Sequence, residues 1–511
     1  MDLQSVWQRT FGFLGSKAII VETSDAMLTS DAGLLPIREF DEALGFTRQF
    51  AGALRDARDA RFTRHSFLEM STARIFGILA DYEDQNDHDA LGKDPVFKLL
   101  ADRLPDDDDL ASQPTLSRFE NAITPRSLLR LEEWFINRFV ESFDQPPAEI
   151  TLDIDVFDDP THGQQQLTFY HGFYKQYQYL VRAITCAEND YVVLPVLLHG
   201  TAHAALGAHL DVARVVKALR AKFPDVRIHL RADSGYAVPV LYETCEDLRI
   251  DYSIGIGMYP AIKQQSAALL QQAVDQYADT SRPQRLFTGF SYQAGSWPMP
   301  RWVVVKCEAN SPGTNRRAVV TNRPGAWVVP QGAYDEYAER GESENRNKEL
   351  KCELCADRLS DHRYMANCFR MFLHCAASNL LIHMRRRIAN PPLEPSTHVV
   401  IQTPQNNPAA SEVPDQLSSE VLIDAGQLNA SVVEHEVPAE AASGRARRQQ
   451  FNRRRQADPL GEGHACTWRL MLIKVAARVE VTARRVRVLL SGSWPFLPFF
   501  RDVGHQLTNT E

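Results

Sequence analysis

The 511-residue sequence predicts an α/β protein built on a mixed β-sheet with helices packed on its faces. From about residue 148 to 260, strand-like and amphipathic helical segments follow one another in the order β-β-β-α-β-α-β. Three strands in a meander and then alternating units imply a sheet with both parallel and antiparallel neighbours. Residues 1 to 147 instead carry apolar side chains at helical spacing, so a helical domain precedes the sheet.

Length and composition restrict the class of protein. With 44% apolar and 24% charged residues the chain is ordinarily globular, and its length predicts two to four domains. The N-terminus lacks a basic head followed by an apolar run, and no stretch approaches the length of a membrane span. Eight scattered cysteines do not form a disulfide framework. We therefore expect a cytoplasmic protein without a membrane partner.

Changes of pattern along the chain predict six parts. They are a helical N-terminal domain (1–147), the first part of a mixed-sheet core (148–260), an inserted mainly β subdomain (261–330), the second part of the core with its functional helix (331–389), a low-complexity insertion (390–463) and a basic helix–strand segment (464–511). The insertion is rich in Pro, Ser, Asn and Gln, which predicts disorder.

The N-terminal domain contains a candidate helix-turn-helix. The segment "LASQPTLSRFENAI" is followed by a helix that opens with Thr124 as its cap and Pro125 at its first position. In a helix-turn-helix, Thr115, Ser117 and Arg118 would lie near the end that reads DNA. An ordinary helical domain explains the same stretch, and the sequence pattern leaves both interpretations open.

Charge is distributed unevenly. The net charge of −9 argues against a nucleic-acid partner, but residues 445–501 carry thirteen Lys/Arg and three Asp/Glu, a local charge of +10. Such asymmetry fits a local polyanion-binding segment. A solvated basic helix beside a disordered basic run explains it equally well.

Three acids lie where chemistry is expected. Asp155 ends the first strand of the sheet, Asp233 ends the fourth, and Glu344 lies on the helix after the β subdomain. If the first and fourth strands are neighbours, two carboxylates lie side by side and the helix brings a third. Clustered carboxylates repel unless a cation neutralises them, and oxygen ligands favour Mg²⁺ or Mn²⁺. Two such ions about 3.5–4 Å apart can hold the attacking and leaving oxygens of a phosphate displacement.

The helix that carries Glu344 has an unusual polar stripe. In "YAERGESENRNKELK", Tyr337, Arg340, Glu344 and Lys351 fall within roughly 60° of one another around a helix axis. If Glu344 is a metal ligand that faces phosphate, the two cations can hold phosphate oxygens and the tyrosine can hydrogen-bond or stack. The alternative is a surface helix with an i,i+4 salt bridge. The two strand-end acids favour the first interpretation.

With these residues in view, the chain resembles a DDE transposase of bacterial insertion sequences, specifically the insertion-sequence-1380 group, which is related to the insertion-sequence-4 group. The four stripe residues match the Y-(2)-R-(3)-E-(6)-K signature at every spacing. Other matching stretches are "SDAGLLPIREFDEAL", "DYEDQNDHDALGKDP", "LASQPTLSRFEN", "LDIDVFDDPTHGQQQ", "RADSGY" and "ENRNKELK". The resemblance covers residues 25 to 385 and resumes at 467 to 490.

The resemblance implies an RNase H-like core, an N-terminal DNA-binding domain and cut-and-paste transposition. Cleavage at terminal inverted repeats and strand transfer into target DNA would use two Mg²⁺ or Mn²⁺ ions. The partners would be double-stranded DNA and a second copy of the chain. The implied metal ligands and catalytic residues are Asp155, Asp233 and Glu344, and the implied DNA contacts are Tyr337, Arg340, Lys348, Lys351, Thr115, Ser117 and Arg118. A metal-dependent DNA nuclease with the same core, and a non-catalytic DNA-binding relic, are the alternatives.

Some positions depart from the family pattern. Phe157 stands where relatives usually have Thr, and Gln166 stands where they often have Glu. Asp153, two residues before Asp155 on the same strand face, is a competing candidate ligand. We prefer Asp155 because it fits the Asp-x-Thr position.

Cysteine and histidine pairs give weaker signals. Cys352 and Cys355 form a C-x-x-C without a second pair, so no zinc site is expected. His199 and His203 surround Gly200 just after a strand, which predicts loop residues rather than a metal-binding helix.

Overall fold

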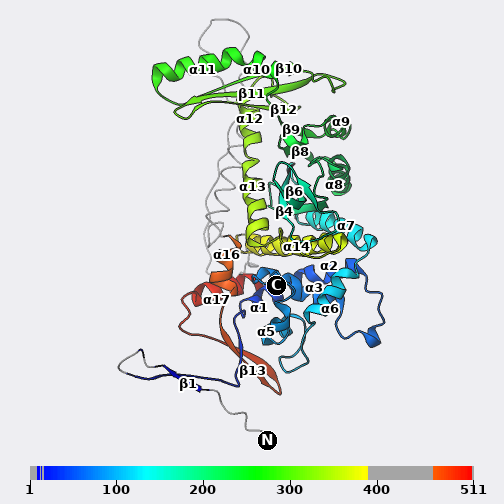
Figure 1. The fold of residues 1–511 in the computed structure, drawn as a ribbon, viewed down its shortest axis with the longest axis vertical. Coiled ribbons are helices and arrows are strands. Elements are labelled where there is room, and N and C mark those ends of the chain that lie inside the picture. Colours follow the sequence, from blue (N-terminus) through cyan, green and yellow to red (C-terminus); the bar gives the residue numbers. More distant parts are fainter. Residues whose placement is uncertain (1–7, 12, 14–16, 390–463, 509–511) are drawn as a thin grey trace, which may run out of the picture.

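The computed structural model describes residues 8–11, 13, 17–389 and 464–508. Figure 1 shows a helical body at one end, a large sheet above it and a long helical column, α12 and α13, that runs beside the sheet. The predicted disorder of 390–463 lies outside the described residues. Within them, no helix is long and apolar enough to cross a membrane.

The N-terminal part is mainly helical. After a hairpin of β1 and β2 and the short strand β3, the elements are α1 (Leu34–Leu44), α2 (Phe46–Leu54), α3 (Phe67–Leu79), α4 (His88–Leu91), α5 (Pro95–Leu100), α6 (Gln113–Asn121) and α7 (Pro125–Glu141), with the strands at Gln8–Phe11, Ile19–Glu22 and Met27–Thr29. Thr124 caps α7 by accepting from the Ser127 N–H at 3.2 Å, and Pro125 is its first residue, as predicted.

A nine-stranded mixed sheet forms the centre of the molecule. Its elements in chain order are β4 (Glu149–Pro160), β5 (Phe169–His171), β6 (Gln176–Cys186), β7 (Val192–Leu198), α8 (Ala208–Lys222), β8 (Arg227–Ala232), α9 (Pro239–Asp247), β9 (Asp251–Ile256), α10 (Pro260–Gln265), α11 (Ala267–Thr280), β10 (Gln284–Tyr292), β11 (Arg301–Asn310) and β12 (Gly313–Thr321). The strand order is β10-β11-β12-β9-β8-β4-β6-β5, and β7 also pairs with β6.

The pairing confirms the predicted mixed sheet. β8 lies parallel to both β4 and β9, and the other pairs are antiparallel. The predicted first and fourth strands, β4 and β8, are neighbours. The segment expected as an inserted β subdomain supplies β10, β11 and β12, which extend this same sheet because β12 pairs with β9.

The side chains of β4 alternate between an apolar face and a face that carries acids. Ile150, Leu152 and Ile154 lie in the apolar core that contains residues of α8 and α9. Asp153 and Asp155 therefore point to the opposite face, which α13 approaches. The sequence of β4 thus presents acids to one helix layer while it buries aliphatic side chains against the other.

The functional helix is divided into three consecutive pieces. It comprises α12 (Pro330–Ala338), α13 (Gly341–Lys348) and a π-helical turn, η3 (Glu349–Glu353), and the long buried helix α14 (Tyr364–Ala389) follows. The sequence instead predicted one continuous helix from Tyr337 to Lys351. A π turn is wider than an α turn, so it changes the direction in which the following side chains point.

The C-terminal part packs on the N-terminal part. It consists of α16 (Ala465–Trp468), the π turn η4 (Arg469–Ile473), β13 (Ala477–Thr482), β14 (Arg485–Leu490) and α17 (Leu497–Thr508). β13 pairs with β3, and residues of this part share one apolar core with the N-terminal helices and α14. The ends of the chain are thereby joined into one helical body.

Candidate catalytic site

Two of the proposed acids lie side by side where the pairing of β4 with β8 stops. The prediction that Asp155 ends its strand was wrong, because β4 continues to Pro160 by pairing with β6. The parallel register of β4 and β8 ends with Ile154 opposite Ala232, so Asp155 and Asp233 come next on their strands. Asp233 begins a 3₁₀ turn and accepts a hydrogen bond from the Gly235 N–H at 2.9 Å. The topology therefore places both carboxylates at the C-terminal end of the region in which β4 and β8 pair.

Arg340 connects the third acid to this edge. Its guanidinium donates to Asp155 at 3.2 Å and to Glu344 at 2.8 Å. The side chain of Asp155 is 16% exposed, whereas that of Glu344 is 61% exposed. One guanidinium thus holds a sheltered strand acid and an exposed helix acid together.

The pKa of Asp155 reflects this crowding. The pKa of its carboxyl is raised to about 6, mainly by burial and also by the charges of Asp233 and Glu344, while Arg340 acts in the opposite direction. The three acids are therefore close enough to interact electrostatically. Carboxylates are ligands that hard divalent cations prefer, but in the described structure the ligand atoms of these three acids do not all lie within 4.8 Å of one another.

Tyr337 approaches the site from α12 across β9. A Cβ atom at Gly255 would lie 2.7 Å from the Tyr337 hydroxyl and 3.1 Å from the Ser234 peptide nitrogen. Only a residue without a side chain leaves room for both groups. Sequence reasoning missed Gly255, because nothing near it in the chain indicates that a tyrosine some eighty residues later lies against it.

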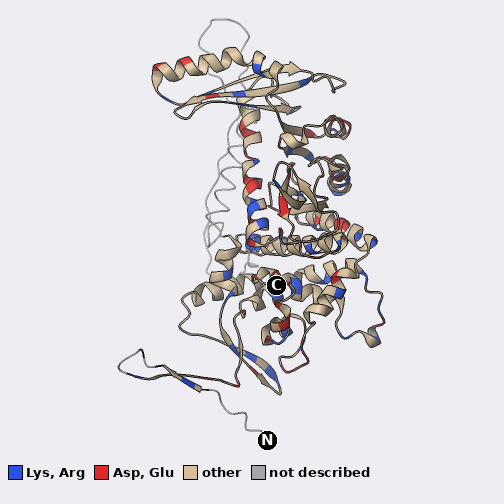
Figure 2. Ribbon diagram, in the orientation of Figure 1, with Lys and Arg blue, Asp and Glu red and all other residues tan. Residues whose placement is uncertain are grey.

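The lysines lie further along the helix. The Lys351 ammonium is 2.5 Å from a carboxylate oxygen of Asp158, three residues beyond Asp155 on β4. Lys348 is exposed at the end of α13. Figure 2 shows acidic and basic residues following one another along α12 and α13.

Asp153 has a different environment from Asp155. Both of its oxygens accept hydrogen bonds from Arg231, at 2.7 and 2.8 Å, and the side chain is fully buried. Arg231 also donates to the Glu336 carbonyl at 2.9 Å, which fixes α12 to the sheet. Sequence reasoning missed Arg231, although a charged residue inside a buried strand indicates a buried partner.

The two departures from the family pattern differ in exposure. Phe157 is buried in the apolar core shared with the N-terminal helices and α14. Gln166 is exposed, and its side-chain oxygen accepts from the Tyr364 N–H at 3.3 Å. Phe157 therefore packs between the sheet and α14, whereas Gln166 contacts the start of α14 at the surface. His199 and His203 lie in the connection between β7 and α8, as predicted.

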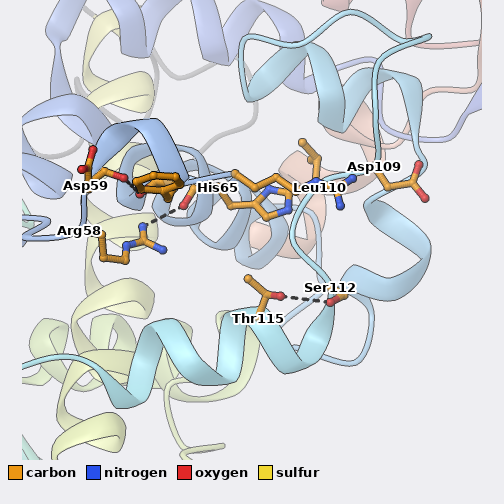
Figure 3. A pocket seen from close by; sticks show the side chains of 10 residues that line it. Arg58, Asp59, His65, Asp109, Leu110, Ser112 and Thr115 are labelled. Carbon is orange, nitrogen blue, oxygen red and sulfur yellow. Dashed lines mark hydrogen bonds between the residues drawn. The ribbon is translucent and has the colours of Figure 1, made fainter.

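The candidate DNA-reading residues lie on α6. Thr115 lines a pocket of about 690 Å³ together with Ser112, Arg58 and Arg64, and the Ser112 and Thr115 hydroxyls are 3.3 Å apart (Figure 3). Arg118 is exposed and donates to the Thr115 hydroxyl at 3.1 Å, and Ser117 is half-buried. The start of α6 therefore combines hydroxyls with two arginines from the connection between α2 and α3.

A second acidic group lies at the base of the sheet. Oxygen and nitrogen atoms of Glu149, His229 and Glu336 come within 4.8 Å of one another. Arg323 forms ion pairs with both glutamates and with Asp251. A guanidinium thus already neutralises these acids, and we assign no metal to them.

Comparison with known families gives the class of the protein. The chain matches the model of the transposase DDE domain group 1 over residues 11–398. The chain therefore belongs to this family of DDE transposases, whose members act on DNA and normally use divalent metals. No curated protein matches the chain.

Proposed function

We propose that the chain is a cut-and-paste transposase of the insertion-sequence-1380 group, with an RNase H-like core. It would cleave DNA at the terminal inverted repeats of its element and transfer the freed strand into target DNA. The observation that carries the proposal is the clamp of Arg340 on Asp155 and Glu344 beside Asp233, in a chain of the DDE family.

The three acids have the role of metal ligands in this proposal. Asp155, Asp233 and Glu344 would hold two Mg²⁺ or Mn²⁺ ions, which when bound activate the attacking oxygen and stabilise the leaving one. Asp153 is excluded from this set because Arg231 takes both of its oxygens. Asp155 and Asp233 come from the strands, and the exposed Glu344 comes from the helix. The solvent-facing side of the site would therefore remain free for the DNA substrate.

The side chains along the helix would position DNA. Lys348 presents positive charge on the exposed side of α13, Arg340 lies beside the acids with 15% of its side chain exposed, and Lys351 adds an ammonium after Lys348. Cations in this arrangement can hold consecutive phosphate oxygens of a DNA strand. Tyr337 would support Arg340, with which its hydroxyl interacts.

The remaining parts would bind DNA away from the site. We assign recognition of the element ends to the N-terminal domain (1–147), with Thr115, Ser117 and Arg118 on α6 as contact residues. The C-terminal segment (464–511) would bind the DNA backbone through its basic hairpin. Two element ends must be brought together, so we expect a homodimer in the DNA complex.

A cleavage assay tests the function. Purified protein is incubated with labelled DNA that carries the gene's own flanking ends, with and without Mg²⁺, and a Glu344→Gln variant is compared. We expect metal-dependent cuts at the element boundary and joining to a second DNA, with end binding but no cutting by the variant. Cutting without dependence on the ends would instead indicate a nuclease, and binding without cutting a relic. Wild-type cutting by Glu344→Gln would contradict the assignment of the site.

A further inference from the structure

Arg340 has an unusual position for a residue whose expected role is to bind phosphate. Its Nη1 lies 3.2 Å from Asp155 Oδ2, and its Nη2 lies 2.8 Å from Glu344 Oε1. The guanidinium is planar, so it lies between the Asp155 oxygen and the Glu344 oxygen, each bound to one of its amino groups. Arg340 therefore occupies the space through which these two carboxylates would share a ligand.

We propose that Arg340 is a built-in counter-ion of the acidic site that a divalent metal must displace, and that its displacement delivers the guanidinium to a DNA phosphate. This inference rests on the proposed function, because it takes Asp155 and Glu344 as metal ligands. It adds a competition between arginine and metal, and from that a coupling between metal binding and DNA binding.

Distances make the competition unavoidable. Mg²⁺ lies about 2.0–2.1 Å from its oxygen ligands, so one ion shared by two carboxylates brings them closer than a guanidinium between them allows. A divalent ion also repels the fixed positive charge of arginine. The Arg340–carboxylate contacts and the metal–carboxylate bonds therefore exclude each other at these two oxygens.

Burial determines where the guanidinium can go. The side chains of Arg340 and Asp155 are 15% and 16% exposed, but that of Glu344 is 61% exposed, and Lys348 follows one turn later on the same open side. A guanidinium that leaves the acids moves outward past Glu344, towards the lysine. A phosphate group placed there meets two cations and receives hydrogen bonds from both.

Thermodynamic linkage then determines whether metal binding and DNA binding strengthen or weaken each other. A polyanion that attracts Arg340 away from the acids uncovers them, so DNA should tighten metal binding, and metal should tighten DNA binding by the same factor. Without the arginine, the acids lose their competitor and this route of coupling is lost.

Mn²⁺ affinity of the full chain tests the inference without any readout of cleavage. Free Mn²⁺ is measured by electron paramagnetic resonance for the wild type and for Arg340→Gln, with and without a short duplex of arbitrary sequence. We expect Arg340→Gln to bind Mn²⁺ about two to five times more tightly, the range for losing one partly exposed ion pair as a competitor. The duplex should tighten Mn²⁺ binding by the wild type and have no such effect on the variant.

Three further variants separate the possible outcomes. Lys348→Gln removes one charge from the same helix and should leave Mn²⁺ affinity without DNA within about twofold of wild type. Arg340→Lys keeps the charge and should give an affinity between those of wild type and Arg340→Gln. Equal or weaker Mn²⁺ binding by Arg340→Gln would overturn the inference. Loss of Mn²⁺ binding in Asp155→Asn shows that the site itself is correct, whereas wild-type binding by this variant would contradict the proposed function.

Discussion

Asp153 and Arg231 form a buried ion pair between β4 and β8, in which the guanidinium donates to both carboxylate oxygens at 2.7 and 2.8 Å. Asp155 lies two residues further on the same strand face and contacts Arg340 instead. Adjacent acids on one strand therefore have different roles. The first fixes the sheet and, through the contact of Arg231 with the Glu336 carbonyl, the helix column. The second remains available to a cation.

Substitution of Asp153 should lower the stability of the fold, whereas substitution of Asp155 should abolish activity without lowering stability. Asp153→Asn leaves the buried Arg231 with only its longer ion pair to Glu339, at 3.6 Å, and we expect it to lower the free energy of unfolding by about 3–5 kcal/mol. Asp155→Asn removes a carboxylate that burial and neighbouring acids already disfavour, so it should be at least as stable as the wild type at pH 7 while losing DNA cleavage. Denaturant unfolding of both variants checks this. Equal destabilisation by the two substitutions would contradict it.

Asp159 should make stability depend on pH. This side chain on β4 is fully buried, and burial, with Asp357 and Asp158 nearby, raises its pKa to about 8. The folded state thus binds the proton more tightly than the unfolded state, whose aspartate pKa is about 3.9. The stabilisation that comes from protonation of Asp159 in the folded state is complete below about pH 4 and is lost as pH rises through 8. Asp159→Asn, a permanent neutral analogue, should therefore gain stability over wild type as pH rises.

Thermal unfolding between pH 4 and 9 measures this effect. The difference in melting temperature between Asp159→Asn and wild type should be small at pH 4 and grow in favour of the variant towards pH 9. The exposed Asp106 provides the control, since Asp106→Asn should give no comparable trend. A difference that does not change with pH would show that Asp159 does not titrate in this range.

Part of the site followed from local sequence patterns. The alternation of apolar and acidic residues in β4, and the Asp after β8, are local signals, and the rules for connecting strands made their two ends neighbours. The i,i+4 spacing of Arg340 and Glu344 gave their salt bridge as the alternative to a phosphate-facing stripe, and the structure contains that salt bridge. These features depend on periodicity and on short connections, which a sequence displays directly.

The rest depends on contacts between distant residues. No local signal pairs β12 with β9, or β3 with β13 across more than four hundred residues, so the β segment was expected as a separate insertion. The π turn at Glu349–Glu353 also has no clear sequence signature. It turns Lys351 to Asp158, whereas an ideal helix would have kept it in line with Glu344.

Gly255→Ala should disable the site without unfolding the protein. The added methyl would lie 2.7 Å from the Tyr337 hydroxyl and 3.1 Å from the Ser234 nitrogen, so either the tyrosine or the turn after Asp233 must move. Misplacement by a fraction of an ångström to 1 Å can reduce a positioned reaction about 100-fold. We expect that loss in the rate of DNA cleavage, with a far-UV circular dichroism spectrum like that of wild type.

Gly52→Ala is the matched control, because a Cβ atom at Gly52 meets no atom within 4 Å. This glycine lies in α2, where alanine is a better helix former, so stability should be equal or slightly higher and cleavage unchanged. Combining Gly255→Ala with Tyr337→Phe removes the hydroxyl that the methyl meets, so the double variant should fit the space better. A single Gly255→Ala variant with full activity would show that Tyr337 tolerates displacement.

The basic C-terminal hairpin should determine part of the salt dependence of DNA binding. Arg469 and Lys474 form ion pairs with Asp81 and Asp31 towards the helical body. The arginines of the hairpin are exposed and alternate with partly or fully buried valines. Figure 2 shows the hairpin with blue segments at its Lys and Arg positions. These exposed residues are Arg478, Arg484, Arg485 and Arg487.

Replacing Arg485 and Arg487 by glutamine should weaken binding to any duplex by a similar factor, because phosphate contacts carry no sequence information. The slope of log K against log salt should become shallower by about 0.9 for each DNA phosphate that the variant no longer neutralises. Fluorescence anisotropy with labelled duplexes, from low to moderate salt, measures both quantities. Arg282→Gln, in the connection between α11 and β10, removes an exposed arginine outside the parts assigned to DNA binding and should leave the slope unchanged. An unchanged slope in the hairpin variant would mean that DNA does not touch this face, and that the local positive charge serves another purpose.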